Sequence, residues 1–532
     1  MLIYFVVVPI LLGVFLYLVP GRSSVRGFAL LAQLGLVVAA VYLFFHVGPY
    51  GYIEEPVGNF YSTLGVILRV DMLSTVFIML STFIFLVAAV YTFNETDSKF
   101  FWFLFFLWEA SLLGVFLTGD FFNIFVLMEV STIVVAILIM YNRHTRSLYD
   151  GMIYLMINVV IMQLFLFGAG YVYIKTGTLD LNMAAERFAD VNPADLILPY
   201  ALIMTFISLK AAQMPMYGWL PKAHGTPGSP SAVSAILSGL HIKSAIYLLL
   251  RFQDVFSPIS SSQFFLILGV VTAVLGIILA VAQTDFKLVL AYSTVAQVGL
   301  IIAGLSMSTT GSYNYYGSMY HIINHAVFKA ALFLSSGVVT YAYGTRDITK
   351  IKGLFKTMPV IATLMILAVM GIIGTPLFNG SISKYFLMAD LDGALNLILI
   401  LVNMGTIIVF VKFSTMFFGE KQKNVNYRID FFRYAPIAVL SVVCFLGGIF
   451  GTQFIYLIFG ESLKVDTAGY IQKSLIFFAS VIGAILIYRF IIKENKFLEK
   501  VRGFEMGFRE MCTAIGVFLM IMLIYVGFVA QI

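Results

Sequence analysis

The sequence predicts an all-α polytopic membrane protein. Hydrophobic residues make up 61% of the 532 residues, and the mean hydropathy of +0.99 covers the whole chain, so apolar character is not confined to one anchor. Charged residues make up only 11%, whereas a soluble protein has about 25%. These values exclude a soluble globular protein and a disordered one. Because a spanning helix needs about 20 residues, the chain has room for well over a dozen crossings.

Hydropathy along the chain divides it into about sixteen apolar segments, each long enough to form a membrane helix. Three of them are long and carry internal breaks. The segments lie at roughly 2–20, 26–47, 70–93, 99–118, 121–141, 150–174, 195–220, 229–252, 262–283, 286–307, 314–342, 358–390, 394–418, 433–459, 473–492 and 511–531.

The basic residues predict the orientation of these helices. If the N-terminus lies outside, most of the 32 Lys and Arg residues fall in loops on the inner side, as the positive-inside rule requires. The even number of segments then places both termini outside. The net charge of +6 reflects these inner loops and does not indicate a nucleic-acid partner. The outer loops are expected to hold only Arg69, Lys175, Arg187, Arg251, Lys464 and Lys473.

The sequence indicates no cofactor and no metal centre in this chain. Its two cysteines, Cys444 and Cys512, lie inside apolar stretches and form no CxxC pair, disulfide framework or iron–sulfur pattern. There is no Walker A motif, no GxGxxG after a strand, no catalytic-triad context and no haem attachment motif. We therefore expect no redox chemistry in the chain itself.

Lysines inside apolar segments are the first functional candidates. Lys412 is near a segment end and can extend to the interface, but Lys210, Lys243, Lys329 and Lys384 lie near the middle of their segments. Each such charge costs about 2.5–3.5 kcal/mol on insertion scales. Four of them are hard to explain without a role in ion movement.

Acidic residues accompany these lysines in the first half of the chain. Glu129 follows Asp120, at the outer start of its segment, by roughly 13 Å along a helix and so lies near mid-membrane. It is predicted to bind a proton or to act as counter-ion to a buried lysine, the alternative being a packing hydrogen bond. Glu109 in the preceding segment can equally well pair with a neighbour.

Two of the lysines lie beside predicted helix breaks. Pro215 follows Lys210 by five residues, and Pro376 and Gly380 precede Lys384. A proline removes a backbone donor, and a discontinuous helix with a mid-membrane charge is how transporters build ion sites. The alternative is an ordinary proline kink. Two such breaks in different halves of the chain point to inverted repeats.

Histidines lie close in sequence to two of these lysines, Lys329 and Lys243. His321, His325 and Lys329 repeat at a spacing of four and form one polar stripe on a helix face. Histidine titrates near physiological pH, so the stripe suits a proton relay. A zinc site is one rival interpretation, although Lys329 would repel a cation, and structural hydrogen bonding is the other. His241 lies two residues from Lys243 and faces elsewhere; it either joins the pathway or packs.

Several of these motifs resemble a known family. The runs Pro215–Ala235, Gln283–Gly299 and Asn324–Ala330 are similar to signatures of the antiporter-like subunits of respiratory complex I and of Mrp cation/proton antiporters. The Glu109, Asp120 and Glu129 run matches as well. The resemblance covers roughly residues 60–420 and is strongest to the Mrp D-like group, which also occurs in membrane-bound hydrogenase-type complexes.

The resemblance implies a core of about fourteen transmembrane helices with two inverted five-helix repeats. Residues 1–98 would be N-terminal helices, 99–252 the first repeat, 262–418 the second repeat, and 433–532 the C-terminal helices. Beyond about residue 460 the chain adds two helices to this core. The linker 493–510 is short and charged, so no long lateral helix is expected.

The resemblance also implies roles for the candidate residues. Glu129 and Lys210 match the family's glutamate–lysine pair, and Lys243 matches the lysine that connects onward. The central relay would be His325 and Lys329, and the terminal lysine on the second broken helix would be Lys384.

We therefore expect a proton-translocating subunit of a multisubunit complex in a prokaryotic cell membrane, coupled to Na⁺ antiport or to redox chemistry in partner subunits. Its partners would be other membrane subunits and the lipid bilayer. The host can be a stand-alone Mrp antiporter, a hydrogenase-type complex or a NADH:quinone oxidoreductase-type complex. A different class is a solute carrier that binds an organic anion at the broken helices. A redox enzyme is a third possibility, disfavoured by the lack of cofactor ligands.

Overall fold

The protein is described by a computed structural model that covers residues 1–19, 23–49, 51–59, 65–96, 98–259, 261–389, 391, 393–421, 425 and 430–529. Within these residues, fourteen helices are long and apolar enough to cross a membrane, and two shorter apolar helices accompany them. Every predicted apolar segment overlaps one of these helices, which confirms the all-α polytopic fold. The described strands form one small antiparallel hairpin, β1 (Ile53–Pro56) with β2 (Ile67–Val70).

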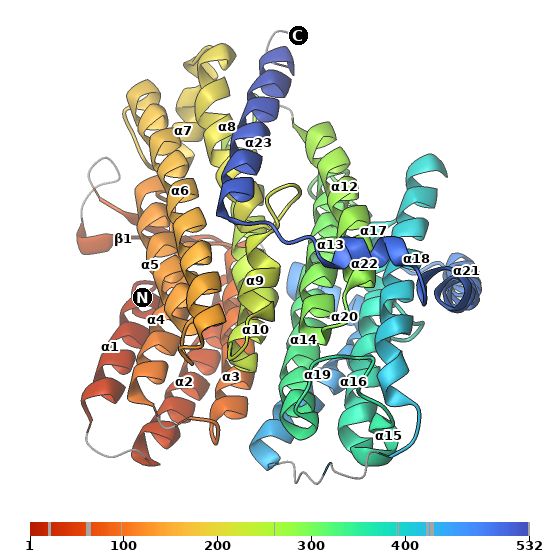
Figure 1. The fold of residues 1–532 in the computed structure, drawn as a ribbon. Coiled ribbons are helices and arrows are strands. Elements are labelled where there is room, and N and C mark those ends of the chain that lie inside the picture. Colours follow the sequence, from red (N-terminus) through yellow and green to blue (C-terminus); the bar gives the residue numbers. More distant parts are fainter. Residues whose placement is uncertain are drawn as a thin grey trace. The chain divides into compact units, whose positions relative to one another are not determined.

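The chain forms two compact units (Figure 1). The first comprises Met1–Ser229, Leu240–Ser261 and Met506–Ile532. Its helices are α1 (Tyr4–Leu18), α2 (Ser23–Val47), α3 (Met72–Thr92), α4 (Lys99–Leu117), α5 (Phe121–Ile139), α6 (Thr145–Thr176), α7 (Leu181–Arg187), α8 (Pro193–Lys210), α9 (Trp219–Gly225), α11 (Ile242–Val255) and α23 (Phe508–Val529).

The second unit comprises Pro230–Gly239 and Ser262–Glu505. Its helices are α10 (Ser231–Ile236), α12 (Ser262–Ala282), α13 (Phe286–Ser306), α14 (Tyr313–Tyr343), α15 (Leu354–Thr357), α16 (Pro359–Ile373), α17 (Asn379–Leu387), α18 (Gly393–Ser414), α19 (Phe431–Ile449), α20 (Gly451–Phe459), α21 (Thr467–Ile487) and α22 (Lys496–Arg502). The predicted division into repeats concerns internal symmetry, which compactness does not test, and it stays a prediction.

Each unit contains one of the two predicted helix interruptions. Helix α8 stops at Lys210 and α9 starts at Trp219, with Pro215 in the non-helical stretch between them. Helix α16 stops at Ile373 and α17 starts at Asn379, with Pro376 between them. Interrupted helices leave backbone carbonyl and amide groups without intrahelical partners. These two positions are therefore where polar side chains can bind the backbone inside the membrane.

Gly380, predicted as part of the second break, has a packing role instead. It lies in the first turn of α17 and is not part of the break. A Cβ atom at this position would lie 1.9 Å from the carbonyl oxygen of Gly371. Glycine therefore permits the start of α17 to pack directly against the end of α16.

Arg251 and Lys473, both expected in outer loops, lie inside helices. Arg251 belongs to α11, and its guanidinium binds both carboxylate oxygens of Asp71, at 2.7 and 2.5 Å. Asp71 also caps α3 by accepting the backbone N–H of Ser74. Lys473 belongs to α21, which starts six residues before the predicted segment. Both residues therefore belong to helices and not to loops, and the side of the membrane on which they lie stays a prediction.

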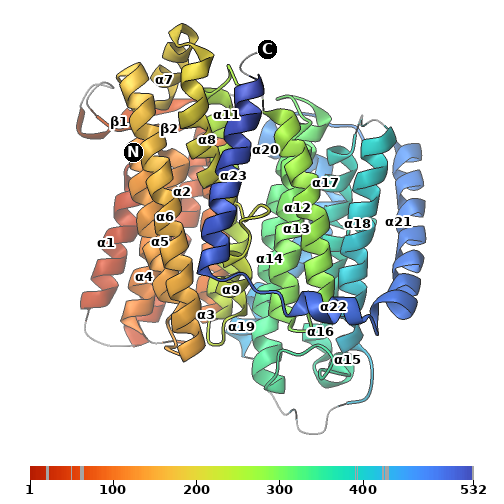
Figure 2. The ribbon, with the colours of Figure 1, turned by 45° about the horizontal axis from the view of Figure 1, so that its top comes forward.

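The C-terminal helices belong to different units. Helix α22 is short, as the charged linker predicted, and packs near α12. Arg502 of α22 donates to the carbonyl of Ala282, and Lys412 of α18 donates to the carbonyls of Val281 and Gln283. Basic groups thus stabilise the carbonyl end of α12. Helix α23 packs beside α8 and α6 of the first unit (Figure 2).

Candidate functional site

The first buried cluster surrounds the end of α8. Lys210 is almost fully buried, and its ammonium donates a 2.7 Å hydrogen bond to Thr132 Oγ1 of α5. Glu129 lies one turn before Thr132 on the same face of α5. Its carboxylate interacts electrostatically with Lys210, but within the described chain the two form no direct hydrogen bond or ion pair. Thr132 is therefore the direct partner of the lysine, and Glu129 acts on it over a longer distance.

His241 joins this cluster. Its Nδ1 lies 3.2 Å from Ser131 Oγ and accepts a long hydrogen bond from Trp108 Nε1 at 3.5 Å. Its Nε2 lies 3.3 Å from the hydroxyl of Tyr154. If Nδ1 accepts, a neutral imidazole carries its hydrogen on Nε2 and donates it to Tyr154. His241 also interacts electrostatically with Lys210, and its place in the pathway stays a prediction.

Lys243 lies just beyond His241 and is fully buried. A π-helical turn, Leu237–His241, comes directly before α11, which contains Lys243. Such turns are rare and are frequent at functional sites, because the extra residue redirects the side chains that follow. The π turn was not predicted from the sequence.

The two other acidic candidates accept hydrogen bonds from neutral groups. Glu109 of α4 is fully buried and accepts a 2.7 Å hydrogen bond from the amide of Gln33 in α2. Asp120 caps α5 by accepting the backbone N–H of Asn123 at 2.7 Å. Burial raises the pKa of Asp120, and the Asp180 carboxylate adds to this, although the backbone N–H groups counteract it. Neither residue is in direct contact with a candidate lysine in the described structure.

A further charged group was not predicted from the sequence. Asp150 of α6 is buried and binds Arg146 Nε at 3.0 Å, with Lys222 Nζ of α9 at 3.8 Å. Lys222 is buried as well. The sequence did contain a signal for this group: Asp150 is an acidic residue at the start of the apolar segment that follows the Arg143–Arg146 loop. This ion-paired group joins the far side of the α8–α9 interruption to α6.

In the second unit, His321 of α14 connects two other helices. Its Nδ1 lies 2.9 Å from Ser383 Oγ of α17, and its Nε2 lies 3.0 Å from Gln297 Oε1 of α13. The Gln297 amide in turn donates to Thr406 of α18 at 3.2 Å. With this amide orientation, Nε2 carries a hydrogen, since the Gln297 carbonyl oxygen can only accept. Gln297 lies within the run Gln283–Gly299, but no pattern in the sequence singles it out.

The rest of the predicted stripe is also buried. His325 packs its ring against Phe328, with ring centroids 5.4 Å apart. The Lys329 ammonium donates to the carbonyl of Leu290 at 2.8 Å and to the hydroxyl of Ser293. Both acceptors belong to α13. The three stripe residues therefore occupy one buried face of α14, and at least two of them bind α13.

Lys384 lies on α17 and turns back to the end of α16. Its ammonium donates to the carbonyl of Ile372 and to Asn403 Oδ1 of α18, both at 2.7 Å. Ile372 is in the last turn of α16, where carbonyl groups lack intrahelical partners and cations are stabilised. Lys384 therefore holds the two halves of the interrupted helix together through a charged hydrogen bond.

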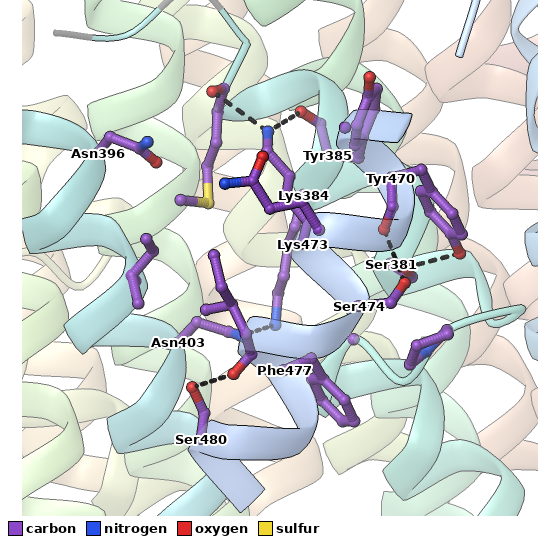
Figure 3. Close-up of a pocket in the computed structure, with 17 residues that line it drawn as sticks. Ser381, Lys384, Tyr385, Asn396, Asn403, Tyr470, Lys473, Ser474, Phe477 and Ser480 are labelled. Carbon is purple, nitrogen blue, oxygen red and sulfur yellow. Dashed lines mark hydrogen bonds between the residues drawn. The ribbon is translucent and has the colours of Figure 1, made fainter. Parts of the chain in front are cut away.

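A cavity of about 210 Å³ lies beside Lys384 (Figure 3). Helices α17, α18 and α21 provide most of its walls. The lysine Lys473 of α21 lines the same cavity. In contrast, no cluster of three or more His, Cys, Asp or Glu side chains that could hold a metal ion occurs among the described residues. The chemistry offered by the buried groups is that of amines, imidazoles, carboxylates, hydroxyls and amides.

These features define a class: a polytopic helical membrane protein with charged groups buried at an interrupted helix in each of two units. The chain belongs to the NADH:quinone oxidoreductase/Mrp antiporter transmembrane family, whose model matches residues 118–427. This confirms the family predicted from the motifs.

Relatives of known identity are similar over most of the chain. The D-type subunit of the Na⁺/H⁺ antiporter of Alkalihalophilus pseudofirmus is 30% identical over 460 residues, covering 82% of this chain and 92% of that protein. The same fold occurs in a chain of the Mrp complex from Dietzia sp., with a TM-score of 0.78 and 24% identity over 91% of this chain and 99% of that one. A chain of an archaeal membrane-bound sulfane sulfur reductase matches with a TM-score of 0.79, 22% identity and the same coverage.

Proposed function

We propose that this chain is a proton-translocating, antiporter-like subunit of a multisubunit complex in a prokaryotic cell membrane, with both termini on the outer side. The family and the similarity to the D-type subunit of a Na⁺/H⁺ antiporter support this function. The structural neighbours, which belong to an Mrp complex and to a respiratory membrane complex, support the presence of partner subunits. The family assignment favours proton movement over the transport of an organic anion.

The observation that carries the proposal is the set of buried lysines with neutral partners. Lys210, Lys329 and Lys384 are 1%, 0% and 6% exposed, and each donates to hydroxyl, amide or carbonyl oxygens. Neutral dipoles stabilise an ammonium less than a carboxylate in contact does. The protonation of such an amine can therefore respond to a change of charge nearby, which is what a proton pathway requires.

The mechanism we propose is electrostatic. When Glu129 accepts a proton, it loses the negative charge that stabilises the Lys210 ammonium. The two groups are one helical turn of α5 apart, because Lys210 binds Thr132. Lys210 then releases its proton more readily, and His241 responds to the changed charge of Lys210 in turn. Lys243, His325, Lys329 and Lys384 would continue the pathway through hydrated polar groups. One broken helix and its lysines in each half support the proposed repeats 99–252 and 262–418.

Two couplings are compatible with this pathway: antiport of Na⁺, and redox chemistry in partner subunits. The name of the family covers both antiporters and quinone oxidoreductases. Co-purification distinguishes the two couplings, because the complex would contain only Mrp-type subunits in the first case, and a hydrogenase-type or NADH dehydrogenase-type module in the second.

The function is tested with the intact complex in sealed membrane vesicles that contain a pH-sensitive dye. Glu129→Gln and Lys210→Met should each stop proton movement, and the double variant should be no worse than either single variant, because the two residues act as one unit. Lys464→Met removes an exposed positive charge and serves as the control. Normal proton movement in correctly assembled Glu129→Gln and Lys210→Met complexes would refute the proposal.

A further inference from the structure

We infer that Lys473 of α21 is a further proton-carrying residue, which receives protons from Lys384 through the cavity between them and passes them to the aqueous side. The inference rests on the proposed function. It assigns a role to the first of the two helices that the chain adds to its predicted core. Three features support it: the volume of the cavity, the polar groups that line it, and the position of the Lys473 ammonium.

The cavity is large enough to hold a short chain of water molecules. Its volume is about 210 Å³, whereas one water molecule occupies about 30 Å³ in the liquid. A cavity holds water when its walls offer polar partners. Hydroxyl and amide side chains supply these partners here, namely Ser381, Asn396, Asn403, Tyr470, Gln472, Ser474 and Ser480.

Helix α21 lines one side of this cavity with several polar side chains. Tyr470, Lys473, Ser474, Phe477 and Ser480 line it, at the spacing of three and four residues that defines a helix face. This face extends over about 15 Å along α21. On the opposite face, large apolar side chains such as Leu475 and Ile482 are exposed in this chain. Helix α21 thus forms one wall of the cavity beside Lys384, and this wall carries hydroxyl groups and the Lys473 amine among apolar side chains.

The two lysines occupy different ends of the cavity. The Lys384 ammonium is bound to Asn403, toward Ser480, whereas the Lys473 ammonium points the opposite way, toward Asn396 (Figure 3). Lys473 lies six residues after the start of α21, about 9 Å along the helix, and it is only half-buried. It therefore lies closer than Lys384 to the end of α21 where the predicted outer loop begins.

The Lys473 ammonium has partners that can hold it in either protonation state. It donates to the carbonyls of Tyr385 and Met388 at 3.1 and 3.5 Å, and it lies 4.5 Å above the ring of Tyr385. These carbonyls end α17, where a positive charge is stabilised. The other titratable side chains that line the cavity with Lys473 are Lys384, Tyr385 and Tyr470, and no acidic residue of the described chain lines it.

The proposed transfer from Lys384 to Lys473 conserves the number of protons. The Lys384 ammonium gives a proton to a cavity water, and this water gives a proton to the neutral amine of Lys473. One N–H bond breaks at Lys384 and one forms at Lys473, so the charge moves from the deep end of the cavity to the shallow end. Lys473 becomes neutral again when it releases its proton to the outer aqueous phase.

The first test separates proton transfer from fixed charge. Lys473→Arg keeps the charge and the hydrogen bonds, but a guanidinium does not release its proton in proteins. Proton movement by the intact complex in vesicles should fall at least tenfold in Lys473→Arg and in Lys473→Met, and stay normal in the control Lys464→Met. Normal movement in Lys473→Arg would overturn the inference. A lack of proton movement in the unchanged complex would instead refute the proposed function.

The second test does not depend on the stability of the Lys473 variants. Ser480→Cys introduces a thiol at the deep end of the cavity, and Ile482→Cys introduces one at similar depth on the opposite face, where Ile482 is 63% exposed. A charged, membrane-impermeant thiol reagent added outside should label Ser480→Cys and block proton movement, because only a thiol in water ionises readily. The Ile482→Cys protein should stay unlabelled. An unlabelled Ser480→Cys would overturn the inference.

Discussion

Thr132 offers the sharpest test of the first buried cluster. Its hydroxyl accepts the hydrogen bond of the Lys210 ammonium at 2.7 Å and donates to the carbonyl of Met128 at 2.8 Å. Thr132→Val keeps the shape of the side chain and removes the hydroxyl. Thr205→Val is the matched control, because Thr205 is equally buried in α8 and its hydroxyl likewise donates to a carbonyl of its own helix, that of Ala201.

The expected effect follows from the loss of one charged hydrogen bond. Hydrogen bonds to charged groups contribute about 1.5–3 kcal/mol, and about 1.36 kcal/mol corresponds to a factor of ten. The charged form of Lys210 should therefore become about one to two powers of ten less favourable relative to its neutral form. If formation of this ammonium is an obligatory step, proton movement should slow by a similar factor.

The measurement is the initial rate of dye quenching in vesicles with equal amounts of assembled complex. Thr132→Val should slow the rate by a factor between about ten and one hundred, Thr132→Ser should restore most of it, and Thr205→Val should leave it within a factor of about two. Equal rates in Thr132→Val and Thr205→Val would refute the reasoning, since they would mean that the hydrogen bond to Lys210 has no part in the transport step.

Three further predictions concern other parts of the chain. Lys384→Met should abolish proton movement while leaving assembly intact; rapid movement in an assembled Lys384→Met complex would exclude Lys384 from the pathway. Reporters in the loops at 143–146 and 493–510 should be cytoplasmic and a C-terminal tag should be external, and a cytoplasmic C-terminus would show that the predicted orientation is wrong. Burial tends to raise the pKa of Asp71, but the hydrogen bonds and charge of Arg251 outweigh it and hold the pKa below its usual value. The ion pair therefore stabilises the fold above a pH of about 4 and loses this effect as the carboxylate protonates at lower pH. Asp71→Asn keeps the helix cap and should lower the melting temperature in detergent at pH 7, with a difference that shrinks below a pH of about 4; a constant difference would contradict this.

The sequence predicted the membrane helices well because hydropathy reports directly on the solvent that surrounds a helix. It also indicated the two interruptions, since proline lacks the backbone donor that a continuous helix needs. It could not indicate the π turn before Lys243, because that turn arises from packing and not from a local residue preference. The hairpin β1–β2 was missed for a similar reason, since a four-residue strand carries almost no periodic pattern.

The candidate site was predictable as a set of residues but not as a set of contacts. A charged residue in an apolar segment is conspicuous, so Lys210 and Lys384 were evident. Their partners Thr132 and Asn403 were not, because single hydroxyl and amide residues are common in membrane helices and only tertiary structure makes one of them the acceptor. The cavity beside Lys384 was equally hidden, since α21 and α17 are far apart in sequence.

The assignment of α23 to the first unit has a consequence for biosynthesis. A ribosome delivers the helices in chain order, so α1 to α9 and α11 enter the membrane long before α23. The surface of α8 and α6 that α23 covers must remain open to lipid, or to an insertion factor, while the whole second unit is synthesised. A chain truncated after Glu505 would therefore lack a helix of the first unit and would leave the surface of α8 that α23 covers exposed to lipid.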